Sequence, residues 1–253
     1  MLETILSIMA HPDDAEFLCA GVLCRLAQER GWLVHIASMT PGDCGSAEHS
    51  AEEISRIRRA EGAAAAAVLG ATYHCLEECD LQVIYNERAL EKATRLYREV
   101  RPTIVLTHSP ADYMLDHEMT STLARAAAFA SAVPNFLCDR GHPNRLDKIP
   151  HLYYADPVEG KDPLGRLVQP AFAIDIGSVL ETKAKMLSAH ASQRDWLLKH
   201  HGMDHYVVSM RQWCENVGKR HGVAFAEGYR QHLGHSYPQD NLLGSLLGSL
   251  AAV

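Results

Sequence analysis

Short apolar runs alternate with amphipathic segments along most of this chain, and this alternation restricts the fold more than any other feature. Strand-like runs are expected at residues 2–10, 33–39, 72–76, 103–108, 152–155 and 171–176. Helical spacing of apolar residues predicts helices at residues 21–30, 50–69, 86–100, 116–131 and 181–199. Alternating strands and helices indicate an α/β fold, in which a mostly parallel sheet carries helices on both faces.

Several helix ends carry recognisable signals. Ser50 followed by Glu53 has the spacing of a capping box, and Asn86 and Asp116 are each expected to cap the start of a helix. Gly31 is expected to end the helix at residues 21–30.

No linker or repeat divides the 253 residues, so we expect a single domain over residues 1–253. Residues 134–170, which are rich in Pro, Gly and charge, are expected to form long loops around two short strands. Residues 200–253 are interpreted as a C-terminal extension. Its last part, residues 240–253, has leucines at helical spacing that would pack on the domain or on another subunit. In the second case the protein would be a homo-oligomer.

Composition excludes some classes of partner. A net charge of -7 argues against a nucleic-acid-binding protein, because phosphate contacts need clustered Lys and Arg. No apolar run approaches the roughly 20 residues that span a bilayer. The start of the sequence has no basic region before its apolar run, as a signal peptide would, so a cytoplasmic location is expected.

A bend with the sequence His11-Pro12-Asp13-Asp14 follows directly on the first predicted strand. Ligands of α/β sheets bind just outside the carboxyl ends of strands, where this bend lies. Zinc in hydrolases usually has three protein ligands among His, Asp and Glu, with one position open. His11 and Asp14 could supply two of them. The best third candidate is His117, which follows the strand at residues 103–108, and Asp13 is then a spare carboxylate placed to act as a general base.

Each of these residues also has an ordinary structural interpretation. His11 could be a solvated loop histidine, and Asp13 and Asp14 could be an acidic pair favoured at the start of a helix. His117 alone could be an ordinary residue of the first helical turn.

Residues 10–16, Ala-His-Pro-Asp-Asp-Ala-Glu, resemble the first signature of the LmbE/PIG-L de-N-acetylases. Residues 114–117, Met-Leu-Asp-His, resemble the second signature, His-x-x-His, with a methionine in place of its first histidine. Weaker similarities lie at residues 58–61, at Asp80 and at residues 190–193, so the resemblance extends over most of the chain.

The resemblance implies a Rossmann-like fold, a zinc ion, and hydrolysis of an N-acetyl amide on an amino sugar or glycoconjugate. By the same resemblance the metal ligands are His11, Asp14 and His117, and the general base is Asp13. It also implies two residues that contact the substrate, Arg58 and Asp80, and we predict Tyr113 as a third. Arg58 could equally be a surface arginine, and Asp80 a turn aspartate.

Met114 stands where many members of that family have a histidine that stabilises the tetrahedral intermediate or protonates the leaving amine. A thioether can do neither. We therefore expect another proton-bearing side chain near the open position of the metal. Tyr113 or a downstream histidine is the expected group, and the candidates in addition to Tyr113 are Asp112, His190, His205 and His235.

Two other classes of protein share part of this pattern. A receiver-type signalling module also carries paired aspartates after its first strand, but its magnesium site has no use for His11. A degenerate family member that binds metal and a glycoconjugate without efficient turnover would explain Met114.

Overall fold

The structure is a computed structural model and describes residues 2–137, 144–194 and 206–251. Within these residues, one sheet has the strand order β3-β2-β1-β4-β5-β7-β6-β8. The strands are β1 (Thr4–Met9), β2 (Leu33–Ser38), β3 (Thr72–Cys75), β4 (Ile104–Thr107), β5 (His151–Ala155), β6 (Phe172–Asp175), β7 (Ala226–Gln231) and β8 (Ser249–Leu250). The helices are α1 (Asp14–Leu18), α2 (Ala20–Arg30), α3 (Ala51–Ala67), α4 (Glu87–Val100), α5 (Leu115–Ser131), α6 (Leu180–Leu187), α8 (Tyr206–Arg220) and α9 (Leu242–Leu247).

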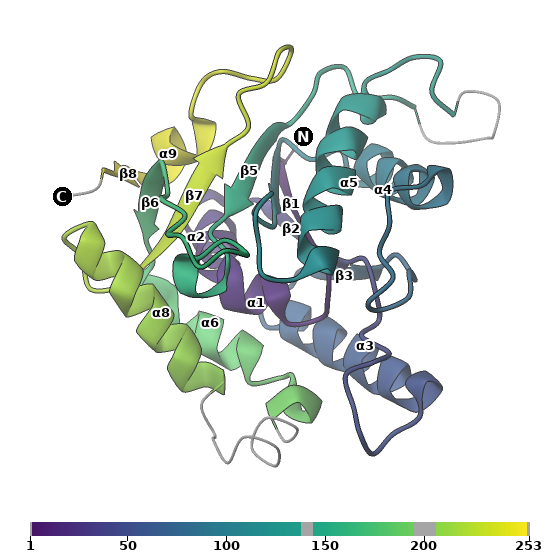
Figure 1. Ribbon diagram of the computed structural model, residues 1–253. Coiled ribbons are helices and arrows are strands. Elements are labelled where there is room, and N and C mark those ends of the chain that lie inside the picture. The colour runs from purple at the N-terminus through teal and green to yellow at the C-terminus, as the bar shows by residue number, and fades with distance from the viewer. Residues whose placement is uncertain (1, 138–143, 195–205, 252–253) are drawn as a thin grey trace.

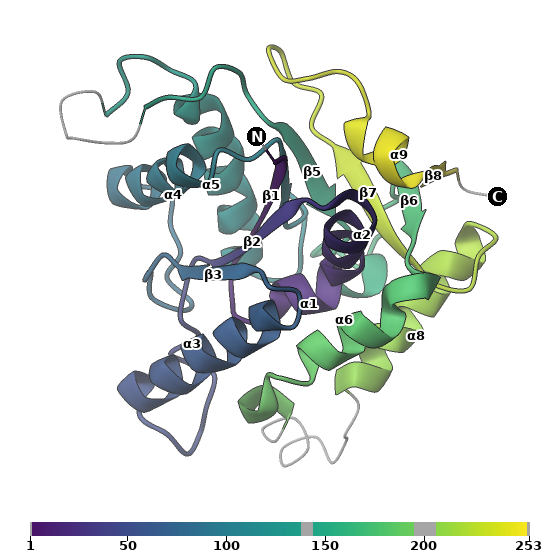
Figure 2. The ribbon, with the colours of Figure 1, turned by 180° about the vertical axis from the view of Figure 1, so that it is seen from behind.

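Helices cover both faces of this sheet (Figures 1 and 2). On one face, α4 and α5 lie side by side and bury residues such as Leu96 and Leu123 against the strands. On the other face, α1, α2, α3 and α6 enclose a larger core that includes Leu23 and Ile174. All six residues of β1 are buried, as expected for a central strand covered on both sides.

The predicted helix caps are largely present. The Ser50 side chain accepts a hydrogen bond from the backbone N–H of Glu53, and the Asn86 side chain accepts one from the N–H of Ala89. Gly31 ends α2 in the left-handed conformation, with φ of 66°. These contacts satisfy backbone groups that a helix end leaves without partners.

The strand order reverses direction at β1. The chain passes from β1 to β2 and β3 on one side, and then returns to β4 on the other side, with all of these pairs parallel. The crevice at the carboxyl ends of β1 and β4 is thus a topological switch point, where α/β sheets bind their ligands. The predicted fold class, an α/β fold with a mostly parallel sheet, is confirmed.

The far end of the sheet is antiparallel. β7 lies between β5 and β6 and pairs with both in the antiparallel sense, and β8 is added to the edge. The carboxylate of Glu227 on β7 accepts hydrogen bonds from the backbone N–H groups of Gly21 and Val22 at the start of α2, at 2.7 and 2.9 Å. Lys183 pairs with the same carboxylate at 2.5 Å. Glu227, in the C-terminal part of the chain, therefore holds the start of α2, the second helix after the His-Pro-Asp-Asp bend.

Three local predictions need correction. Asp116 does not cap α5, since Met114 occupies the N-cap position and Asp116 lies in the first turn. The long helix expected at residues 181–199 is wrong, because α6 ends at Leu187; residues 195–199 lie outside the described residues. Over its described residues, which end at 251, the tail is helical only in the short α9, which buries Leu243 and Leu247 before β8.

In the part of the chain that the structure describes, no helix is both long enough and apolar enough to cross a membrane.

Candidate metal centre and active site

The site lies at the carboxyl ends of β1 and β4, where a cavity of about 460 Å³ opens to solvent. His11, Asp13 and Asp14 reach it from the bend after β1, and His117 reaches it from the first turn of α5. The other residues that line the cavity are Phe17, Leu18, Cys44, Gly45, Arg58, Asp80, Leu81, Tyr113, Met114, Val158, Gln193 and Tyr206. The chain reversal at β1 thus gathers segments that are about 100 positions apart.

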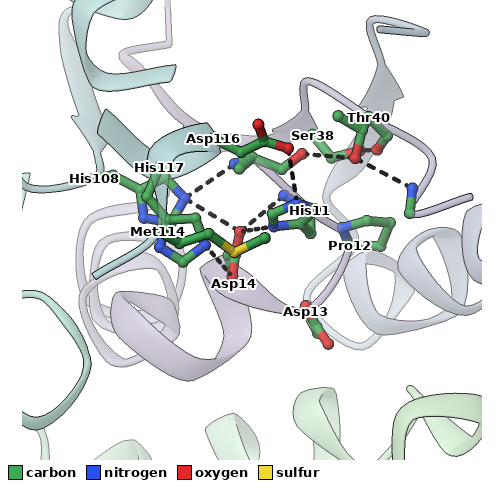
Figure 3. A network of polar contacts seen from close by, with 12 residues as sticks. His11, Pro12, Asp13, Asp14, Ser38, Thr40, His108, Met114, Asp116 and His117 are labelled. Atoms are coloured by element: carbon green, nitrogen blue, oxygen red, sulfur yellow. Dashed lines mark hydrogen bonds and ion pairs between the residues drawn. The ribbon is translucent and has the colours of Figure 1, made fainter. Parts of the chain in front are cut away.

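Three of these side chains form a group that could hold a metal ion. His11, Asp14 and His117 each offer one donor atom, and the three atoms lie within 4.8 Å of one another. Nδ1 of His11 is 3.3 Å from Asp14 Oδ2, and Nε2 of His117 is 3.6 Å from Asp14 Oδ1 (Figure 3). Two imidazoles and one carboxylate are a donor set that fits zinc or another divalent transition metal with an open position. The solvated alternative for His11 is wrong, since only 8% of it is exposed.

Each of the two imidazoles also donates a hydrogen bond to a carboxylate. Nε2 of His11 donates to Asp80 Oδ1 at 3.0 Å and lies 3.5 Å from Asp116 Oδ2. Nδ1 of His117 donates to Asp112 Oδ1 at 3.0 Å. Such partners fix the tautomer and the direction of a metal-binding histidine. Sequence reasoning missed this role for Asp112 and Asp116, which have the pattern of ordinary acidic residues near a helix start.

His108 was also missed. Its side chain is fully buried after β4, and its ring stacks on that of His117, with ring centres 3.9 Å apart. Its Nε2 accepts a hydrogen bond from the backbone N–H of Ala10 and lies 3.1 Å from Asp14 Oδ2. Burial and the neighbouring His117 lower the pKa of His108. The only available signal was its place at the end of a strand.

Asp13 adopts a backbone conformation that non-glycine residues rarely take, with φ of 105°. Its carboxylate reaches away from the three donors, and Oδ2 pairs with the Tyr206 hydroxyl at 2.5 Å and with Arg58 Nη2 at 3.3 Å. Burial raises the pKa of Asp13, and the Arg58 guanidinium opposes that shift. Strain of this kind persists where surrounding structure imposes it, often at functional sites.

The three residues expected to contact substrate all line the cavity. Arg58 is not a surface residue: 4% of it is exposed, and Nη2 donates to the carbonyl oxygen of Pro12 at 2.7 Å. Gly42 and Gly45 lie against its guanidinium, where a Cβ atom would clash. Asp80 is buried behind His11, whereas Tyr113 is 63% exposed and meets His117 edge-on. Their contacts with a substrate stay predictions.

Met114 lines the cavity beside the metal group (Figure 3). Of the candidate proton-bearing groups, Tyr113 is in the cavity, and His190 is buried with Nε2 3.4 Å from Glu16. His235 is exposed and is not among the cavity residues, and His205 lies outside the described residues. A hydroxyl that sequence reasoning did not propose, that of Tyr206, enters the cavity and contacts Asp13.

Comparison with known proteins agrees with this arrangement. Residues 6–128 match the family model described as PIG-L, GlcNAc-PI de-N-acetylase. A diacetylchitobiose deacetylase from Thermococcus kodakarensis is 26% identical over 248 residues, covering 90% of this chain and 83% of the relative. A 4-oxalmesaconate hydratase from Pseudomonas putida is 25% identical over 240 residues, covering 89% of this chain and 88% of the relative.

Among solved structures, the N,N'-diacetylchitobiose deacetylase from Pyrococcus horikoshii superposes with a TM-score of 0.77 at 25% identity. The match covers 95% of this chain and 88% of that one. The resemblance to the LmbE/PIG-L family is therefore confirmed, and the family model itself covers β1 through most of α5, the part of the chain that carries all three donors.

Proposed function

We propose that this protein is a metal-dependent amide hydrolase that removes the acetyl group from an N-acetylated amino sugar or glycoconjugate, with zinc as its metal. The observation that carries the proposal is the convergence of His11, Asp14 and His117 at the mouth of an open cavity that Asp13 also lines. The match to the de-N-acetylase family and the two similar deacetylases support the same chemistry.

In this proposal each residue near the metal group has a defined role. A zinc ion held by His11, Asp14 and His117 would act as a Lewis acid on the acetamide and its attacking water. Asp13 takes the proton from that water and returns it to the departing amine. The carboxylates of Asp80 and Asp112 keep the two imidazoles directed toward the donor group.

Arg58, Asp80 and Tyr113 are the residues proposed to contact the substrate. The Arg58 guanidinium is held by the Pro12 carbonyl, and in this proposal it donates to sugar hydroxyls. The exposed ring of Tyr113 at the rim suits the apolar face of a sugar.

Hydration of an unsaturated acid is a second candidate, favoured by one observation. A hydratase matches 89% of the chain, and Met114 removes a donor that acyl transfer would use. Activation of water by a base beside a metal would serve both reactions. The degenerate alternative, which binds without turnover, has no support, because the named relatives are enzymes.

The deciding experiment measures acetate release from a panel of N-acetylated sugars, sugar-thiols and glycolipids by the purified protein. Release that a chelator abolishes and zinc restores is the expected result. In parallel, loss of ultraviolet absorbance is followed with conjugated unsaturated di- and tricarboxylic acids. Absorbance loss without acetate release would replace the proposal with the hydratase. The cytoplasmic location and the homo-oligomer stay predictions.

A further inference from the structure

The first residue of α8 reaches back to the bend after β1. Tyr206 lies 193 positions from Asp13 in the sequence, yet its hydroxyl donates to Asp13 Oδ2 at 2.5 Å. Its ring packs 6.1 Å from that of Phe17 on α1, and it lines the same cavity as the three metal donors. Tyr206 lies outside the segment that the family model matches, residues 6–128.

The same oxygen of Asp13 has a second partner. Arg58 Nη2 is 3.3 Å from Oδ2, and that guanidinium is itself held by the carbonyl oxygens of Pro12 and Gly42. No described residue donates a hydrogen bond to Oδ1, and Oδ1 is not a buried unpaired atom. One oxygen of the carboxylate is thus anchored from two sides, and the other is left to the cavity.

We infer that Tyr206 is a positioning residue: with Arg58 it anchors one oxygen of Asp13 and leaves the other to accept the proton of the attacking water. The inference rests on the proposed function, in which Asp13 is the base. A base must lie within hydrogen-bond reach of the proton it takes, and a misplacement of about 1 Å can cost about 10²-fold in rate. A hydrogen bond and an ion pair on one oxygen restrict rotation of the carboxylate about its Cβ–Cγ bond.

Three observations favour this role over simple packing. A phenylalanine would fill the same space beside Phe17, so the ring alone does not require a hydroxyl. Burial raises the pKa of Tyr206 well above its usual range, and the Asp13 carboxylate adds to the shift, so the hydroxyl stays a hydrogen-bond donor. The left-handed backbone of Asp13 shows that the direction of this side chain is maintained at a cost.

The other candidate donors do not contact the base in the same way. The ring of Tyr113 faces His117 and is largely exposed. The ring of His190 is buried, and its Nε2 lies 3.4 Å from Glu16 Oε2. Among the described residues of the C-terminal half of the chain, Tyr206 is therefore the one that donates a hydrogen bond to Asp13.

The test compares Tyr206→Phe with the wild type on a substrate from which the wild type releases acetate. We expect kcat to fall about 10- to 100-fold, while KM and zinc content stay within about twofold. Tyr237→Phe is the matched control, because that hydroxyl donates to the carbonyl oxygen of Arg125, away from the cavity, and it should leave kcat unchanged.

A double-mutant cycle separates positioning from packing. If Tyr206 acts through Asp13, Tyr206→Phe should have no further effect on the residual rate of an Asp13→Asn variant. A full additional loss in the Asp13→Asn background, or an unchanged kcat in the single variant, would overturn the inference.

A crystal structure of the zinc-loaded protein gives a readout that needs no turnover. The Tyr206 hydroxyl should lie within hydrogen-bond distance of Asp13 Oδ2 in the wild type, and the Asp13 carboxylate should change direction in Tyr206→Phe. A wild-type structure with the hydroxyl bonded elsewhere, or an unmoved carboxylate in the variant, would refute the role. If no panel member releases acetate, the proposed function fails, and the structures still decide the position of Tyr206.

Discussion

The centres of the His108 and His117 rings lie 3.9 Å apart and the rings are within 9° of parallel, although one follows β4 and the other lies in the first turn of α5. Stacking of this kind restricts rotation of the proposed ligand, and Nε2 of His108 also approaches Asp14 at 3.1 Å. His108 therefore contacts two of the three proposed metal ligands, His117 and Asp14.

Replacing His108 with alanine should weaken zinc binding by about 10- to 100-fold, because the substitution removes the ring that stacks on His117. The dissociation constant can be measured by competition with a chromogenic chelator. His49→Ala is the control, since that histidine pairs with Glu53 on the surface of α3. Equal zinc affinity in both variants would show that the stacking has no influence on the ligand.

Replacing the proposed ligands themselves should have a larger effect. His11→Ala or His117→Ala removes one of three donors, so zinc content in the purified protein should drop well below one ion per chain. Atomic emission on protein dialysed against metal-free buffer measures this. His35→Ala, outside the cavity, should keep the wild-type content. Full occupancy in both ligand variants would exclude the assignment.

Asp13→Asn should separate metal binding from catalysis. The amide keeps the size of the side chain but cannot act as a base, so the rate should fall by about 10²–10⁴-fold while zinc stays bound. Steady-state kinetics together with metal analysis test this. An active, zinc-bound variant would mean that Asp13 serves only the start of α1.

Met114→His should raise kcat for deacetylation. An imidazole at this position, beside the metal group, adds a donor for the developing oxyanion, an interaction that changes rates by about 10²–10³-fold in other enzymes. Met114→Leu is the matched control and should show no gain, because neither thioether nor isobutyl group donates a hydrogen bond. Equal rates for the two variants would indicate that the site already has a sufficient donor.

Asp156 should make the protein less stable as pH rises. Burial raises its pKa to about 6, and neither carboxylate oxygen has a hydrogen-bond partner among the described residues. Between about pH 4 and pH 6 the folded state binds more protons than the unfolded state, so the free energy of unfolding falls through this range and stays lower above it.

Asp156→Asn should remove this dependence. At pH 7 the variant should be more stable than the wild type, by on the order of 1–3 kcal/mol, with little difference at pH 4. Urea unfolding at a series of pH values measures the effect. Asp147→Asn, with a side chain that is 92% exposed, should leave the pH profile unchanged. If the substitution changed the free energy of unfolding by the same amount at every pH, its effect would be on packing instead.

The sequence was most informative where the pattern is local. The strands β1 to β6 and the caps at Ser50 and Asn86 follow from periodicity and from side chains that satisfy nearby backbone groups. The gathering of His11 and His117 followed from strand order, because parallel strands bring their carboxyl ends to one edge.

The sequence was least informative where the contact is distant. Tyr206 has no motif around it and meets Asp13 only through tertiary packing. β7, with the sequence Ala-Glu-Gly-Tyr-Arg-Gln, lacks the apolar alternation of a typical strand, although its first four residues are buried. Its burial depends on ionic contacts such as that of Glu227 with Lys183, which no periodicity reveals.

The contact of Glu227 with the start of α2 has a consequence for how the protein is made. A chain emerges from the ribosome with its N-terminus first, so the three proposed metal ligands are available once residue 117 has been synthesised. The strand that fills the gap between β5 and β6 and secures α2 arrives more than 100 residues later. Nascent chains that stop before residue 226 should therefore possess every proposed zinc ligand and still lack a competent enzyme, so that activity depends on the synthesis of β7.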